Sequence, residues 1–166
     1  MRNVFLAVLL TGFLLLGQGG SAAAAPRLVQ QMDIVADKAV TPMDYSFFDQ
    51  PATGRVELYN VKNLWGAGAE MIFYVETGDG SDWLILNFSN STVELRLQQR
   101  KLPLFSERVG AITAATPLVL TIDDGILKAS IGGRSKTVAG VTAFRGNLTT
   151  QSIEATLKAY RFMEPR

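Results

Sequence analysis

Short runs of β-forming residues recur along residues 28–162, separated by Gly, Asp and Asn at intervals of about 8–12 residues. The clearest run covers residues 92–100, where Val93, Leu95 and Leu97 alternate with polar side chains. A period of two places the apolar side chains on one face of a strand and the polar side chains on the other. The sequence therefore predicts an all-β chain that folds as an antiparallel β-sandwich or barrel.

About nine strands are expected from this pattern. They cover residues 28–35, 55–61, 70–77, 82–88, 92–100, 117–122, 126–133, 136–144 and 152–162, with a weaker run at 108–114. Asp123-Asp124-Gly125 joins two of these runs and is typical of a tight hairpin turn, because Asp and Gly tolerate positive φ. No repeat or linker interrupts residues 25–166, which we expect to form one domain.

Two segments leave alternatives open. Residues 36–54 contain Pro42 and Pro51 and are expected to form a long loop that covers the core with Met43, Tyr45, Phe47 and Phe48. Residues 152–162 also fit helical spacing, since Ile153, Leu157 and Tyr160 fall on one helical face. The shared parity of Ile153, Ala155, Leu157 and Ala159 favours a strand.

The first 24 residues follow the pattern of a secretory signal peptide. Arg2 precedes the apolar stretch 4–16, and small residues follow it, with Ala22 and Ala24 placed for cleavage after Ala24. The stretch is shorter than the roughly 20 residues of a transmembrane helix. We expect an exported chain, periplasmic or extracellular, whose mature part begins at Ala25. An uncleaved N-terminal anchor is the alternative.

Composition excludes several kinds of chemistry. The chain has no Cys and no His, so disulfides, thiolate or Ser–His–Asp catalysis and Cys- or His-ligated metals are ruled out. Removal of residues 1–24 takes away only Arg2 among the charged residues, which lowers Lys+Arg from 16 to 15 against 15 Asp+Glu. A neutral mature chain argues against nucleic acid as a partner.

Residues 117–134 (PLVLTIDDGILKASIGGR) and the closing stretch 152–162 (SIEATLKAYRF) carry a family resemblance. They resemble the hairpin and the final, aromatic-ended strand of concanavalin A-like (laminin-G-like) β-sandwiches. The resemblance covers about the C-terminal two-thirds and implies a jelly-roll sandwich that binds sugars, proteins or lipids, or in some branches cleaves glycosides. The E-x-D-x-x-E signature of the laminarinase-like branch is absent. Immunoglobulin-like sandwiches remain an alternative.

Aromatic residues give the best indication of a ligand. Trp65 lies in the Gly-rich stretch NLWGAG and is a candidate for stacking on a sugar ring. The candidate hydrogen-bonding partners of that sugar are Asn60, Asn63, Asp79 and Asp82. Trp83 begins a deeply apolar run, so we expect it to plug one end of the core instead. A core position for Trp65 is an equal alternative.

Carboxylates are the remaining acid–base groups. Glu70 and Glu76 share a strand but lie about 20 Å apart, too far for glycoside hydrolysis. Glu57 paired with Glu76 or Glu94 across strands is a further option, although solvated outward positions are favoured for all three. The acidic turns at 79–82 and 123–125 offer too few oxygens for calcium, and Asx turns explain them better. We therefore expect no metal site. A bound calcium ion is the alternative.

Three functions follow from these observations. The first is a non-catalytic binding module, lectin-like, for a glycan or cell-surface polymer. The second is a structural, assembly or adhesion component of the cell envelope that docks a protein through sheet edges or Tyr45, Phe47 and Phe48. The third is a carboxylate-dependent glycosidase. Sequons at Asn87, Asn90 and Asn147 are glycosylation sites only in a eukaryotic secretory route.

Overall fold

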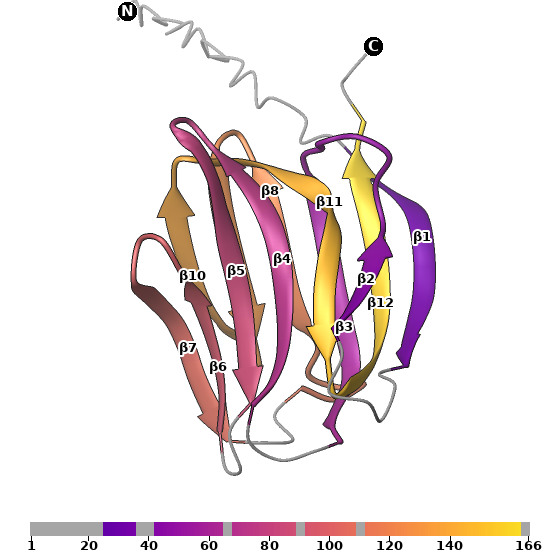
Figure 1. Ribbon diagram of the computed structural model, residues 1–166. Coiled ribbons are helices and arrows are strands. Elements are labelled where there is room, and N and C mark those ends of the chain that lie inside the picture. Colours follow the sequence, from indigo (N-terminus) through magenta and orange to yellow (C-terminus); the bar gives the residue numbers. More distant parts are fainter. Residues whose placement is uncertain (1–24, 36–41, 65–67, 89–91, 109–111, 164–166) are drawn as a thin grey trace, which may run out of the picture.

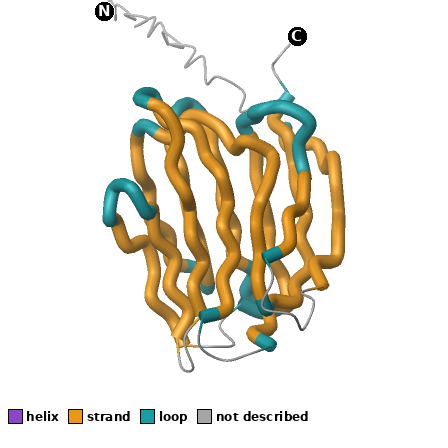
Figure 2. The backbone as a smooth tube through the Cα atoms, in the orientation of Figure 1, coloured by secondary structure: helices purple, strands orange, loops and turns teal. Residues whose placement is uncertain are grey.

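The computed structural model describes residues 25–35, 42–64, 68–88, 92–108 and 112–163. All regular secondary structure in these ranges is β-strand (Figure 2). Over the same ranges, no helix of the length and apolarity needed to cross a membrane is found. The all-β prediction is confirmed.

Twelve strands form two six-stranded antiparallel sheets that face each other, with sheet B in front of sheet A in Figure 1. Sheet A contains, in spatial order, β1 (Pro26–Val35), β12 (Ile153–Phe162), β3 (Gly54–Asn63), β8 (Leu118–Asp123), β9 (Ile126–Ile131) and β10 (Arg134–Ala139). Sheet B contains β2 (Met43–Ser46), β11 (Val141–Gln151), β4 (Ala69–Thr77), β5 (Gly80–Phe88), β6 (Thr92–Leu97) and β7 (Leu102–Arg108).

The chain passes repeatedly between the two sheets, which is the connectivity of a jelly roll. Strands β4 to β7 form a meander in sheet B, and β8 to β10 form one in sheet A. Strands β11 and β12, which follow each other in sequence, lie in different sheets. Residues 152–162, which also fit helical spacing, form a strand as favoured.

Gly140 divides the single strand expected at 136–144. It has a φ of +76° and separates β10 in sheet A from β11 in sheet B. Only glycine adopts such a φ readily, so the chain changes sheets at this residue. The prediction of one strand here is wrong. The hairpin turn at Asp124-Gly125 is confirmed, since both residues have positive φ (46° and 70°).

Two edge strands differ from the sequence prediction. β2 lies within the expected loop 36–54 and pairs with β11. β7 covers residues 102–108, whereas the weaker run was placed at 108–114. Pro103 lacks an N–H, but an edge strand such as β7 tolerates this because one of its sides has no neighbouring strand.

The core lies between the sheets and consists of the side chains at every second position of each strand, which point inward. Among its fully buried side chains are Leu58, Phe73, Leu84, Leu95, Leu120, Phe144 and Leu157. Phe47 and Phe48 pack at this core against Phe144, with ring centroids 6.1 and 6.3 Å from it. The two phenylalanines cover the core as expected. Because they are 2% and 6% exposed, the hypothesis that they dock a protein partner is wrong.

Candidate functional site

The outer face of sheet B carries an aromatic pair, an exposed Trp83 and a half-buried Tyr74. Tyr74 on β4 lies directly opposite Trp83 on β5, and both side chains point away from the core. We call the surface around them the sheet B face. It consists of Ile72, Tyr74, Trp83, Ile85, Asn87, Glu94, Arg96 and Gln98.

Trp83 is 43% exposed, so the prediction that it plugs the core is wrong. Its neighbours along the strand give the physical reason. Asp82, Leu84 and Leu86 take the inward positions of β5, and successive side chains of a strand point to opposite faces. Trp83 therefore points outward although the run around it is strongly apolar.

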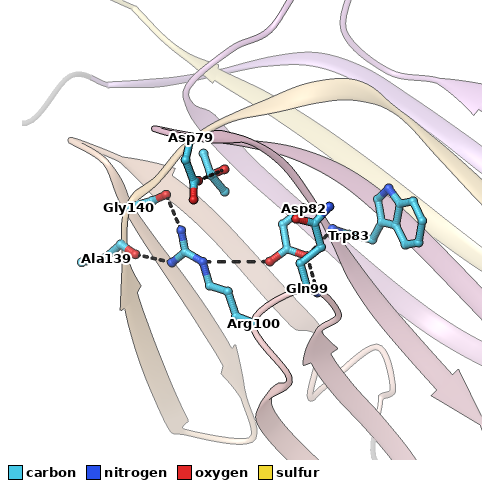
Figure 3. Close-up of polar contacts among 8 residues, drawn as sticks. Asp79, Asp82, Trp83, Gln99, Arg100, Ala139 and Gly140 are labelled. Carbon is cyan, nitrogen blue, oxygen red and sulfur yellow. Dashed lines mark hydrogen bonds and ion pairs between the residues drawn. The ribbon is translucent and has the colours of Figure 1, made fainter.

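Asp82 occupies the inward position next to Trp83 and fixes its backbone (Figure 3). Its Oδ1 accepts the N–H groups of Trp83 (2.7 Å) and Gln99 (2.8 Å). The N–H of Gln98 also donates to the carbonyl of Trp83 at 2.9 Å. The bonds from Gln98 and Gln99 join the start of β5 to the turn after β6. Together the three bonds fix the backbone from which the indole projects onto the sheet B face.

Arg100 extends this anchor to the other sheet. Its Nη1 and Nη2 donate to the carbonyls of Ala139 (2.6 Å) and Gly140 (2.8 Å), where the chain passes from sheet A to sheet B. Its Nε lies 4.0 Å from Oδ2 of Asp82 (Figure 3). A carboxylate and a guanidinium thus stand at the end of the sandwich where an aromatic plug was expected.

A hydrogen-bond chain orients Tyr74 from the opposite side. The hydroxyl of Thr149 on β11 donates to Oδ1 of Asp44 at 2.5 Å. A hydroxyl has one proton, so the 3.2 Å contact between Tyr74 and Thr149 has Tyr74 as its donor. Both aromatic residues of the sheet B face are therefore held by polar contacts of neighbouring strands.

The sequence-predicted site residues that the structure describes lie in both sheets, with Asn60 in sheet A, Asp79 at the β4–β5 turn and Asp82 on β5 in sheet B. Trp65 lies outside the described residues, and Asn63 is the last residue of β3. Asn60 lies on β3 and Asp79 lies on the turn beyond β4, and both residues are exposed. Asp82 is 1% exposed and bonded to backbone, which makes it a turn anchor instead of a hydrogen-bonding partner for a sugar.

Asn60 lines a separate hollow of about 550 Å³ on sheet A. It has a φ of +51° and lies where β3 and β12 shift register. An ion pair between Lys62 and Glu154 (2.9 Å) stands at the rim. None of the described lining residues is aromatic, so this hollow lacks the stacking surface that the sheet B face offers.

The alternative carboxylate pairs of Glu57 with Glu76 or Glu94 are not formed, because Glu57 lies in sheet A whereas Glu76 and Glu94 lie in sheet B. Glu57 is also buried (5% exposed), contrary to the solvated position favoured from the sequence. It forms an ion pair with Arg55 and accepts hydrogen bonds from Tyr59 (2.5 Å) and Tyr160 (3.1 Å). These neighbours cover the carboxylate on the outer face of sheet A.

The electrostatics of this cluster disfavour tyrosinate. The hydrogen bond to Glu57 raises the pKa of Tyr59 to about 12, assisted by burial and the negative charge of Glu57. Burial, followed by the same carboxylate, raises the pKa of Tyr160. Both tyrosines therefore remain protonated at neutral pH and serve as hydrogen-bond donors.

The described residues contain no group of three or more Asp or Glu side chains placed to hold a metal ion. At the turn before β5, Asp79 accepts a hydrogen bond from the hydroxyl of Thr77 at 2.7 Å, and this bond is the main cause of its lowered pKa. The bond is typical of a turn that satisfies its own polar groups.

No protein-family model and no curated protein sequence matches this chain. Solved structures do. A galectin from Caenorhabditis elegans is 11% identical, with a TM-score of 0.44 over 77% of this chain and 94% of its own. A fructofuranosidase from Schwanniomyces occidentalis, solved with fructose, is 11% identical with a TM-score of 0.51 over 82% of this chain. This chain spans about a third (34%) of that enzyme's length.

A lichenase from a mouse hindgut metagenome is 10% identical, with a TM-score of 0.48 over 80% of this chain and 79% of its own. The expected resemblance to concanavalin A-like β-sandwiches holds at the level of the fold, a jelly-roll sandwich of two antiparallel sheets. At identities of 10–11% the ligand has to be argued from the residues of this chain.

Proposed function

We propose that this chain is an exported, non-catalytic glycan-binding module whose ligand stacks on Trp83. The observation that carries the proposal is the outward, 43% exposed Trp83 beside Tyr74, with a backbone held by hydrogen bonds to Asp82 and Gln98. A rigid aromatic face with polar groups around it suits a sugar ring, because the ring has both apolar C–H faces and hydroxyl groups.

Polar side chains lie beside the aromatic pair on the outer face of sheet B. Gln98 follows β6 beside Trp83, and Asn87 lies between Glu70 and Glu94 in one cross-strand row. Amide and carboxylate groups donate to and accept from hydroxyls. The proposal assigns these side chains to the hydroxyl groups of the bound sugar.

Glu70 and Glu94 are the acidic pair that an enzyme on this face would use. They lie two strands apart, which corresponds to about 10 Å between their Cα atoms, with Asn87 between them. In the proposed module neither carboxylate takes part in a cleavage reaction. Incubation with each bound glycan should release no reducing ends, and release that is abolished in E94Q would contradict the non-catalytic part of the proposal.

Export rests on the N-terminal pattern. Cleavage after Ala24 would leave β1 intact, since this strand begins at Pro26. The expected mature product has 142 of the 166 residues. Mass spectrometry of the periplasmic and culture fractions of a bacterial expression host tests this, and a full-length product retained in the membrane fraction would contradict it.

Calorimetric titration with a panel of soluble oligosaccharides tests glycan binding. Trp83→Ala should weaken binding by about 2 kcal/mol, or ~30-fold, as the loss of a central aromatic contact does. Ile126→Ala is the matched control, because Ile126 is equally exposed (44%) but lies on sheet A. Panel-wide absence of binding, or equal weakening by both variants, would overturn the proposal.

A further inference from the structure

A polar hollow of about 330 Å³ adjoins the aromatic pair on the sheet B face. It is lined by Glu94, Arg96, Gln98, Lys101 and Pro103, from β6, β7 and the turn that joins them. Gln98 connects it to the aromatic pair, since its N–H donates to the carbonyl of Trp83. A ligand stacked on the indole would therefore extend into this hollow.

Arg96 is the central residue of the hollow. It lies opposite Ile85 on β5 and Pro103 on β7, diagonally across from Trp83. Its side chain is half-buried and lines the hollow. A guanidinium carries five N–H donors and a permanent positive charge. The N–H groups that face the hollow can therefore bond an acceptor from outside the protein.

The charges around Arg96 favour an anionic acceptor. Lys101 is exposed at the turn and lines the same hollow. Lys136 reaches across from β10 and donates to the carbonyl of Pro103 at 3.0 Å, which brings a third cation to this edge. Among the described residues of the lining, Glu94 is the only acidic one. Two cations therefore line the hollow against one carboxylate.

We propose that the module prefers acidic glycans, with Arg96 binding the carboxylate or sulfate of a sugar stacked on Trp83. The planar guanidinium matches an oxyanion with two parallel N–H donors, which the point charge of a lysine does not. The inference rests on the proposed glycan-binding function and adds the charge class of the ligand.

Matched charged and uncharged ligands test the preference. The probes are oligogalacturonate against its fully methyl-esterified form, and a sulfated galactan oligosaccharide against its desulfated form. The wild-type protein should bind at least one charged probe about tenfold or more tightly than its neutral counterpart. This preference should decrease as salt concentration rises. The first pair reports a uronate ligand and the second a sulfate ester.

Single substitutions test whether Arg96 is the source of the preference for charged glycans. Arg96→Gln should abolish the preference by weakening the binding of the charged probe, while Arg96→Lys should retain only part of the preference. Glu94→Gln should increase the affinity for the charged probe, because it removes the one negative charge of the lining. Lys128→Gln removes an exposed cation from the outer face of sheet A and should have no effect.

The outcomes separate the two proposals. Equal affinity for charged and neutral forms, or a preference that survives in R96Q, overturns the acidic preference and leaves glycan binding intact. If R96Q fails to fold, E94Q provides the test. An E94Q protein that binds the charged probe no more tightly than the wild type overturns the proposed acidic preference. Absence of binding by every probe and by the neutral panel overturns the proposed function itself.

Discussion

The hydroxyl of Tyr59 donates a 2.5 Å hydrogen bond to Oε2 of Glu57, two residues earlier on the same strand. Tyr160 of the neighbouring strand donates to the same oxygen at 3.1 Å. Lys158 lies opposite Glu57 in register, yet its ammonium group stands 5.0 Å above the ring of Tyr59. The outer face of sheet A thus holds a carboxylate whose acceptor sites are already occupied by the protein.

Alkaline titration tests this arrangement. The folded state raises the pKa of Tyr59 from 10.0 to about 12, because ionised Tyr59 would lose its bond to Glu57 and repel it. The stabilisation is therefore complete below pH 10 and is lost as the pH rises towards 12. Absorbance at 295 nm should show late ionisation of Tyr59, and E57Q should shift it to lower pH. Identical titrations of the two proteins would refute the assignment.

Asp82 should contribute strongly to stability, because its buried carboxylate accepts two backbone hydrogen bonds. Asp82→Ala leaves the N–H groups of Trp83 and Gln99 without their acceptor, at a cost of about 2–4 kcal/mol in the free energy of unfolding. Urea denaturation measures this. A double-mutant cycle with R100A should show coupling of about 0.5–3 kcal/mol, because the two side chains form one cluster. Additive effects would mean that Arg100 acts only through Ala139 and Gly140.

Gly146 should not tolerate a side chain. It has a φ of +89°, and a Cβ added there would lie 2.3 Å from the carbonyl oxygen of Phe48. The carbonyl of Gly146 also accepts the N–H groups of Phe47 and Phe48, so the backbone cannot shift freely. Gly146→Ala should cost about 2–4 kcal/mol of unfolding free energy.

The control for this prediction is Gly78→Ala. Gly78 lies on the turn between β4 and β5, and a Cβ added there meets nothing within 4 Å. Its effect should stay within about 0.5 kcal/mol, measured by urea denaturation. A Gly146→Ala protein as stable as this control would show that the Phe48 segment moves easily.

The binary pattern of the sequence predicted the inward face where the alternation was clean. Val93, Leu95 and Leu97 on β6 point inward as their parity required. The error at Trp83 came from weighing the apolar character of its run above its parity. Leu84 and Leu86 are apolar and share one parity of the strand, so the opposite parity of Trp83 predicts an outward indole.

Long-range pairings could not be predicted, because strand register depends on contacts between distant segments. Tyr160 and Glu57 are 103 positions apart, and Arg100 meets Gly140 across 40 positions. The sequence did not indicate that Gly140 separates β10 from β11. The run around it is continuously β-forming, and a single glycine also occurs inside strands. The candidate site is likewise a product of register, since Tyr74, Trp83 and Arg96 meet only when β4, β5 and β6 align.

Fluorescence of single-tryptophan variants tests the central claim most directly. The chain contains only Trp65 and Trp83, so W65F reports on Trp83 alone and W83F on Trp65 alone. Acrylamide quenching is measured for each variant with and without the tightest glycan of the calorimetric panel. The account predicts that bound glycan shields Trp83 in W65F from the quencher. Unchanged quenching of W65F at saturating glycan would contradict it.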